Sequence, residues 1–257
     1  MRVLETTLRE VRDGGRRCLI GYVMGGVRAD WTDLMRAMVD GGADVIEIGV
    51  PFSDPMLDGP VIQRACRSAL GRGVSLERIL DDLPEVAAPV VAMTYTNQLV
   101  SRGFSTYMRA LSRSGVCGSL VADLPFAESA EYLSVARDSD VAPVLMVAPS
   151  TPLEAAVQIA GASEGFVYSM SAMAPTGSEG AGGDAGRQAA QRLRSRVDVP
   201  VVVGFGIDSP ERAARAVRHS DGVVVASALM QRVLDGASAA TIAGTVAEFR
   251  RRIDSAA

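Results

Sequence analysis

Two acidic residues, Glu47 and Asp58, stand where carboxyl groups could work as an acid–base pair. Glu47 lies inside the apolar run DVIEIGV (44–50), between Ile46 and Ile48, where burial of a lone glutamate is costly. If this run is a strand, alternation points Glu47 away from both isoleucines. Burial there raises the pKa of the carboxyl group, as a general acid requires. The alternative is a structural carboxylate paired with a cation.

Asp58 belongs to the segment that follows, GVPFSDPMLDGP (49–60). Its three prolines stiffen the chain, so the segment can hold a carboxylate in fixed geometry over a strand end. Pro60 is well placed as the first residue of a helix, so Asp58 could instead cap that helix. Spacing leaves both roles open. If both acids act, one is buried and protonated and the other is ionised.

The elements that position these acids recur along the chain as short apolar runs rich in β-branched residues. Such continuous runs are typical of strands buried on both faces of a parallel sheet. They are CLIGYVM (18–24), DVIEIGV (44–50), PVVAMTY (89–95), GSLVADL (118–124), APVLMVA (142–148), GFVYSM (165–170), PVVVGFG (200–206) and GVVVAS (222–227).

Amphipathic segments follow these runs, and many begin with Ser, Asp or Pro, as helix starts require. Eight strands alternating with helices in 257 residues predict a (β/α)8 TIM barrel, with an extra N-terminal helix. A doubly wound sheet is the runner-up, but no GxGxxG follows its first strand. The predicted helices are 30–41, 60–70, 105–114, 129–138, 152–160, 184–196, 209–218 and 239–253.

Bulk properties narrow the class of protein. The net charge of -4 argues against nucleic-acid binding, which needs a basic surface. Three scattered cysteines form no CxxC motif, so neither a zinc site nor a disulfide framework is expected. No apolar run reaches the ~20 residues of a membrane span. We therefore expect one domain over residues 1–257, in the cytoplasm and without a membrane partner.

A phosphate site is predicted at the end of the barrel where the strands finish. Gly204-Phe-Gly206 follows the seventh run, and Ser227 opens a short helix after the eighth. Loops in these places commonly hold phosphate on a helix N-terminus, and Thr176-Gly177 could complete the site. Tyr168, near the end of the sixth run, could reach the substrate or be a core tyrosine.

With these residues in view, the chain resembles the tryptophan synthase alpha subunit, an indole-3-glycerol-phosphate lyase. The most specific stretch is EIGVPFSDPMLDGPVIQ (47–63), and weaker agreement continues in register over nearly the whole chain. It includes GGAD (41–44), YTN (95–97), VADLP (121–125), AP (142–143), TG (176–177), GFGI (204–207) and SA (227–228).

The resemblance implies a retro-aldol cleavage that yields indole and glyceraldehyde 3-phosphate without a metal or organic cofactor. Glu47 would protonate carbon 3 of the indole ring, and Asp58 would accept the indole N–H. The family partner is a pyridoxal-phosphate beta subunit, in an alpha-beta-beta-alpha complex that receives indole through a tunnel. The resemblance assigns Tyr22, Met93, Tyr168 and Thr176 to the substrate, Gly177, Gly206 and Ser227 to its phosphate, and Asp54, Pro55 and Asn97 to the partner interface.

Three departures from the family pattern predict local differences. Ala172-Met-Ala-Pro175 replaces Arg-Ser-Gly-Val in the sixth loop, which affects loop closure and coupling to a partner. Ala226 replaces the glycine before Ser227, and Gly21-Tyr-Val-Met24 replaces Pro-Phe-Val-Thr at the indole pocket. Alternatives therefore stay open: a stand-alone lyase that releases indole, a related aldolase with another substrate, or a mainly regulatory subunit that activates a beta-type partner.

Overall fold

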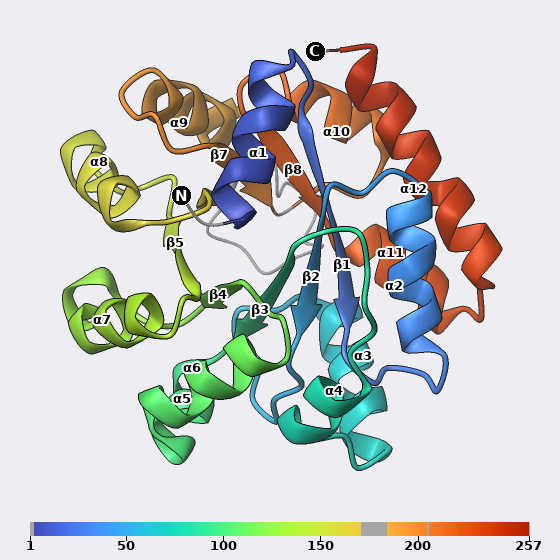
Figure 1. The fold of residues 1–257 in the computed structure, drawn as a ribbon. Helices are drawn as coiled ribbons and strands as arrows, with labels where there is room; N and C mark the ends of the chain where they lie inside the picture. Colours follow the sequence, from blue (N-terminus) through green and yellow to red (C-terminus); the bar gives the residue numbers. More distant parts are fainter. Residues whose placement is uncertain (1–2, 171–183, 205, 257) are drawn as a thin grey trace.

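Eight parallel strands close into a barrel in chain order, with helices around it (Figure 1). The computed structural model describes residues 3–170, 184–204 and 206–256. The predicted (β/α)8 barrel is confirmed. Its strands are β1 Cys18–Met24, β2 Val45–Gly49, β3 Val90–Thr94, β4 Gly118–Val121, β5 Ala142–Val147, β6 Val167–Met170, β7 Val201–Gly204 and β8 Gly222–Val225.

Helices follow the strands on the outside of the barrel. The predicted helical segments are all helical at their centres, and two short helices, α4 and α5, were not predicted. The helices are α1 Val3–Asp13, α2 Trp31–Asp40, α3 Pro60–Gly71, α4 Leu76–Asp82, α5 Thr96–Arg102, α6 Phe104–Arg113, α7 Ala130–Asp138, α8 Leu153–Ala162, α9 Asp184–Arg194, α10 Pro210–Ala216, α11 Ser227–Leu234 and α12 Ala239–Asp254, with a 3₁₀ turn at Phe126–Glu128.

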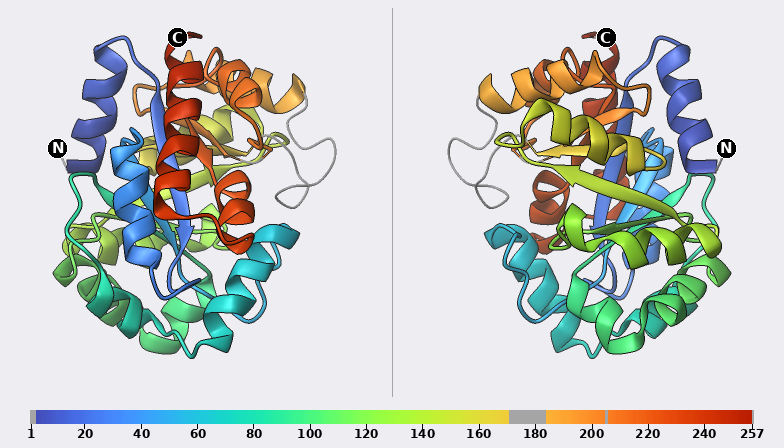
Figure 2. Two further views of the ribbon diagram at one scale, coloured as in Figure 1. Left: turned by 90° about the vertical axis from the view of Figure 1, so that its right-hand side faces the viewer. Right: turned by 90° about the vertical axis from the view of Figure 1, so that its left-hand side faces the viewer.

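The extra helix α1 closes the end of the barrel where the strands begin. Its Leu4 is fully buried and packs against Gly118, the first residue of β4, and against Gly165 just before β6. A Cβ at either glycine would lie within 3 Å of the Leu4 side chain. In the left view of Figure 2, α1 (dark blue) lies on the left and α3 (cyan) on the right, at opposite ends of the barrel.

The register of the strands decides which side chains point into the barrel. A Cβ at Gly21 would meet Met38 of α2, so Gly21 faces outward and its neighbour Tyr22 faces inward. Tyr22 pairs with Glu47 across β1 and β2, and Glu47 pairs with Val91 of β3. Glu47 therefore points into the interior. None of the described helices is long and apolar enough to span a bilayer.

Candidate active site

Glu47 is a buried carboxyl group on β2 with an unsatisfied oxygen. Its side chain is 3 % exposed, and among the described residues its Oε2 atom has no hydrogen-bond partner. Burial, and then the negative charge of Asp58, raises the pKa of Glu47 to about 8. A carboxyl group with that pKa is mainly protonated at neutral pH, so it can donate a proton.

Asp58 lies in the loop between β2 and α3, and its carboxylate is held by a tyrosine. The hydroxyl of Tyr95, which directly follows β3, donates to Asp58 Oδ2 over 3.0 Å. Burial raises the pKa of Asp58 to about 6, and the hydrogen bond from Tyr95 opposes that rise. The helix-cap alternative is wrong, because the N-cap of α3 is Gly59 and the helix has no side-chain cap.

The loop that carries Asp58 is fixed at several points. The ring of Phe52 stacks on Tyr95, with 5.2 Å between the ring centroids. The backbone N–H of Phe52 donates to Cys66 Sγ over 3.1 Å, and the thiol donates back to the Phe52 carbonyl. Gln63 Nε2 donates to the Asp58 carbonyl over 2.9 Å. Helix α3 and strand β3 therefore hold the loop from two sides.

Two tyrosines from opposite parts of the barrel flank the acids. The Tyr22 hydroxyl lies 1.9 Å from the position that a Cβ at Gly49 would take, and the Tyr168 hydroxyl lies 1.8 Å from that of Gly204. Only glycine leaves this room. Burial raises the pKa of each tyrosine, and the charges of Glu47 and Asp58 raise it further, so the four groups lie near one another. Met93 pairs with Gly49 across β2 and β3 and lies on the same inward face.

The predicted phosphate residues lie after β7 and β8. Gly206 has a φ of +70°, a left-handed conformation that favours glycine. Ser227 is the first residue of α11, and its buried Oγ has no hydrogen-bond partner among the described residues. Ala226 is the N-cap and supplies no side-chain cap. Thr176, Gly177 and the departure at Ala172 lie outside the described residues.

The predicted interface residues lie on the rim of this end of the barrel. Asp54 and Asn97 are exposed and Pro55 is half-buried. Helix α5 joins the rim to the loop after β2, since Gln98 Nε2 donates to the Pro51 carbonyl over 3.0 Å. A cavity of about 400 Å³ beside them is lined by Phe52, Ser53, Asp54, Pro55, Met56, Gln63, Cys66 and Arg67.

A metal site is not evident in the described part of the chain. No three His, Cys, Asp or Glu side chains there lie close enough together to hold an ion. The acids that converge on the barrel interior are Glu47 and Asp58, and their surroundings are aromatic. Such a site fits proton transfer to and from a flat organic ligand.

Known proteins share this sequence and this geometry. The family model of the tryptophan synthase alpha chain matches residues 8–256. The chain belongs to that family. The alpha chain of Thioalkalivibrio sulfidiphilus is 39 % identical over 256 residues, which cover 95 % of this chain and 96 % of the relative. That of Burkholderia pseudomallei is 37 % identical over 264 residues, with coverage of 99 % and 97 %.

Solved structures agree with this membership of the tryptophan synthase alpha chain family. A chain of Mycobacterium tuberculosis tryptophan synthase superposes with a TM-score of 0.90 at 32 % identity, covering 98 % of each chain. The alpha subunit from Legionella pneumophila superposes with a TM-score of 0.86 at 26 % identity, covering 99 % of each. The chain thus has the alpha-chain function in tryptophan biosynthesis, that of an indole-3-glycerol-phosphate lyase.

Tyr95 is the residue of the site that the sequence interpretation missed. The YTN motif (95–97) counted only as part of the family resemblance, and only Asn97 was assigned a role. One signal was available: Tyr95 directly follows an apolar run, at the end of the barrel where active sites lie. Its bond to Asp58 could not be found that way, because it depends on the fold of the loop after β2.

Proposed function

We propose that Glu47 and Asp58 divide the retro-aldol cleavage of indole-3-glycerol phosphate between them. The observation that carries this proposal is the buried Glu47 carboxyl, whose Oε2 has no hydrogen-bond partner among the described residues, beside a second buried acid. Glu47 gives its proton to carbon 3 of the indole ring, and Asp58 accepts the indole N–H and stabilises the cationic indolenine. The Glu47 carboxylate then takes the glycerol hydroxyl proton as the carbon–carbon bond breaks, which releases indole and glyceraldehyde 3-phosphate.

The pKa values of the two acids support these different roles. With a pKa of about 8, Glu47 is protonated at pH 7, whereas Asp58, with a pKa of about 6, is mainly ionised. Each group is then in the state that its step needs. After each turnover Glu47 regains its proton from the substrate, so the cycle needs no other acid.

The phosphate of the substrate is proposed to bind at the start of α11. The buried Ser227 Oγ lacks a partner among the described residues, and α11 begins without a side-chain cap. Free N–H groups and the helix dipole favour an anion there. Gly206, Gly177 and Thr176 are the other proposed contacts, and Tyr22, Met93 and Tyr168 are proposed to enclose the ring.

A pyridoxal-phosphate beta subunit is the proposed partner, on the rim that carries Asp54, Pro55 and Asn97. Two large apolar side chains in this region support the proposal, because Met56 is 71 % exposed and Val100 is 61 % exposed. Exposed apolar groups beside polar ones often mark protein interfaces. We further propose that residues 1–257 act as one barrel domain, in the cytoplasm.

A related aldolase that works through a Schiff base is disfavoured by composition. Apart from His219, the basic residues of the chain are 26 arginines, and the sequence contains no lysine. No side chain of these residues can supply the ε-amino group that such an aldolase needs. This supports acid–base chemistry by the carboxyl pair.

The test is release of indole and glyceraldehyde 3-phosphate from indole-3-glycerol phosphate by the purified chain, with and without a beta-type partner. We expect turnover by the chain alone, and faster turnover with the partner. Turnover that the partner leaves unchanged would favour a stand-alone lyase. No turnover in either mixture would refute the proposal.

Asp58→Asn separates the proposed role from a structural one. We expect the variant to lose turnover by at least about a hundredfold while it keeps the thermal midpoint of the wild type. The matched control is Asp81→Asn, an exposed carboxylate on α4, which should change neither. An Asp58→Asn variant that unfolds or keeps full turnover would contradict the assigned role.

A further inference from the structure

Tyr22 places a hydroxyl group in the barrel interior. An unsubstituted indole ring would leave this hydroxyl without a hydrogen-bond partner. Tyr22 lies on β1, directly opposite Glu47 in the register of β1 and β2. It faces the barrel interior and is 3 % exposed. Its hydroxyl is buried and, among the described residues, has no hydrogen-bond partner.

The position of this hydroxyl is defined by the strand beside it. It occupies the space above Gly49, only 1.9 Å from where a Cβ would stand. Any larger residue at position 49 would push the tyrosine out. Burial, then the charge of Asp58, then that of Glu47 raise the pKa of Tyr22, so the hydroxyl faces the same space as the two acids.

The neighbours of Tyr22 do not satisfy the hydroxyl. Asp58 Oδ2 accepts from Tyr95, and no hydrogen bond joins Tyr22 to Glu47 among the described residues. A bare indole ring would not satisfy it either. The one polar atom of that ring is its N–H, which is a donor like the phenol and is assigned to Asp58.

We propose that Tyr22 determines specificity, and that the chain selects an indole ring with an oxygen substituent on the edge that faces β1. The inference rests on the proposed function, because it takes the ring to bind between the two acids. A ring oxygen accepts a hydrogen bond from the Tyr22 hydroxyl, so this buried donor is no longer left unpaired. Relief of such a donor is expected to strengthen binding about tenfold or more.

The same pocket would then discriminate between substrates by a mechanism that apolar contacts do not provide. An apolar pocket rejects a ring with an added hydroxyl only weakly, whereas a site with a buried hydrogen-bonding group discriminates strongly against a ligand that leaves it unpaired. The preferred substrates are therefore ring-oxygenated indole-3-glycerol phosphates.

The test compares the binding of indole with that of 4-, 5-, 6- and 7-hydroxyindole to the full chain by calorimetry. We expect at least one isomer to bind wild type at least about tenfold more tightly than indole. In Tyr22→Phe, which keeps the ring, that preference should fall to within about threefold. The control is Tyr132→Phe, which removes a buried hydroxyl that bonds to the Ser119 carbonyl outside the site, and should keep the preference.

Two results would overturn the inference. One is a wild type that binds every hydroxyindole no more tightly than indole. The other is a preference that survives unchanged in Tyr22→Phe. Because binding is measured without turnover, failure of the inference is distinct from failure of the proposed lyase chemistry, which the release of indole decides. Thermal unfolding of both variants verifies that they are folded.

Discussion

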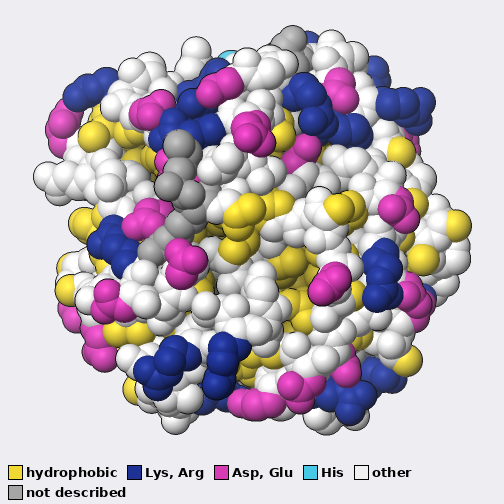
Figure 3. Space-filling view, viewed as in Figure 1, with side chains coloured by type: hydrophobic (Ala, Val, Ile, Leu, Met, Phe, Trp, Pro, Cys, Tyr) yellow, Lys and Arg dark blue, Asp and Glu magenta, His cyan; other side chains and the backbone are white. Residues whose placement is uncertain are grey.

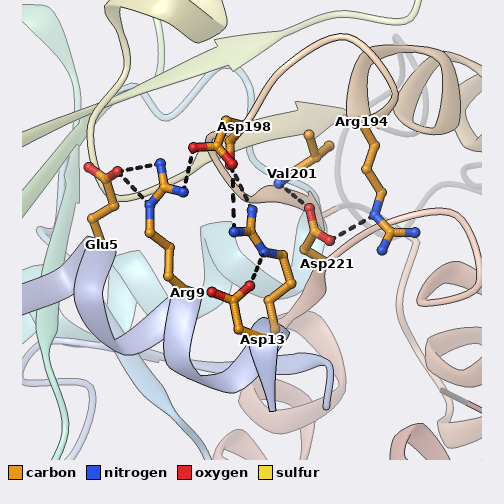
Figure 4. A network of polar contacts seen from close by, with 8 residues as sticks. Glu5, Arg9, Asp13, Arg194, Asp198, Val201 and Asp221 are labelled. Atoms are coloured by element: carbon orange, nitrogen blue, oxygen red, sulfur yellow. Dashed lines mark hydrogen bonds and ion pairs between the residues drawn. The ribbon is translucent and has the colours of Figure 1, made fainter. Parts of the chain in front are cut away.

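The two ends of this barrel treat buried carboxylates in opposite ways. At the end where the strands begin, Asp221 precedes β8 and is 3 % exposed. It accepts the backbone N–H of Val201 over 2.9 Å and Arg194 Nε over 2.7 Å (Figure 4). Asp44 precedes β2 and accepts the N–H of Leu19 over 2.8 Å and Arg250 Nη1 over 3.0 Å. Each acid therefore accepts one hydrogen bond from the backbone of a strand and one from an arginine side chain.

The surface around this end continues the same pattern. Figure 3, drawn in the view of Figure 1, shows basic and acidic side chains beside one another on this face. Close to α1, Asp198 accepts from Arg9 over 2.6 Å, and Arg9 also meets Glu5 (Figure 4). The charges at this end therefore tie α1 and the strand starts together.

At the end where the strands finish, Glu47 and Asp58 have few hydrogen-bond donors around them in the described part of the chain. Glu47 Oε2 meets no donor among the described residues, and Asp58 is held by one phenol. Burial raises the pKa of both acids, and for Glu47 the negative charge of Asp58 raises it further. The comparison teaches that in this fold a buried carboxylate that is paired stabilises a strand, whereas one that is unpaired is available for proton transfer.

The largest expected effect is on catalysis, in Glu47→Gln. The amide keeps the shape of the side chain but has no proton to give, so kcat should fall by about 10² to 10⁴. The measurement is indole release under saturating substrate. Glu131→Gln, an exposed glutamate on α7, is the control. A Glu47→Gln variant with wild-type kcat would break the comparison, because the unpaired acid would then be inactive.

The next effect is on stability, in Asp44→Ala. Removal of this carboxylate leaves the Leu19 N–H without its acceptor, whereas Arg250 keeps Asp254 and the Arg17 carbonyl as partners. The free energy of unfolding should therefore fall by about 2 kcal/mol. Urea denaturation measures the change. Activity per folded molecule should stay unchanged. Asp33→Ala, an exposed acid on α2, should cost less than about 0.5 kcal/mol, and an equal loss in both variants would contradict the assignment.

The third effect is the pH dependence of the reaction. In the proposed reaction, turnover needs Glu47 protonated and Asp58 ionised, so kcat/KM should be greatest near pH 7, with limbs near pH 6 and pH 8. Beyond each limb the rate should fall about tenfold per pH unit. A profile that is flat from pH 5 to 9 would show that these two groups do not set the rate.

Stability should respond to the same titration in a defined direction. The pKa of Glu47 is raised from 4.5 to about 8 by folding, so between these values the folded chain holds a proton that the unfolded chain has lost. Stability from this group is therefore present below pH 4.5 and is lost as pH rises towards 8. Glu47→Gln should remove this part of the pH dependence.

Much of the fold could be predicted because the strands are marked by composition. The run CLIGYVM became β1 without change, and PVVVGFG became the shorter β7, because apolar β-branched runs suit a sheet buried on both faces. Helices α4 and α5 escaped prediction. Each has seven residues, and neither begins with the proline that marks the start of α10, which is equally short and was predicted.

The site was less predictable because its contacts join distant segments. Glu47 could be recognised from its place in an apolar strand. Asp58 could not be separated from a helix cap by spacing, since Gly59-Pro60 follows it in either case. The deciding contact comes from Tyr95, 37 residues further along the chain, and only the closed barrel brings the two together.

The smallest expected effect follows from that contact, in Tyr95→Phe. The hydrogen bond from Tyr95 lowers the pKa of Asp58 and so opposes the effect of burial. Without it, the acid limb of the kcat/KM profile should move above pH 6, and kcat/KM near that limb should fall about tenfold. The rate at pH 8, where Asp58 is ionised in either form, should fall less.

A structural role for Tyr95 would give a different result. Loss of packing would lower the rate equally at every pH, whereas loss of a positioning hydrogen bond moves the limb. Tyr95→Phe keeps the ring that stacks on Phe52, so the loop after β2 should stay in place. If the limb stays near pH 6 while the rate falls uniformly, Tyr95 supports the loop and Asp58 owes its ionised state to another group.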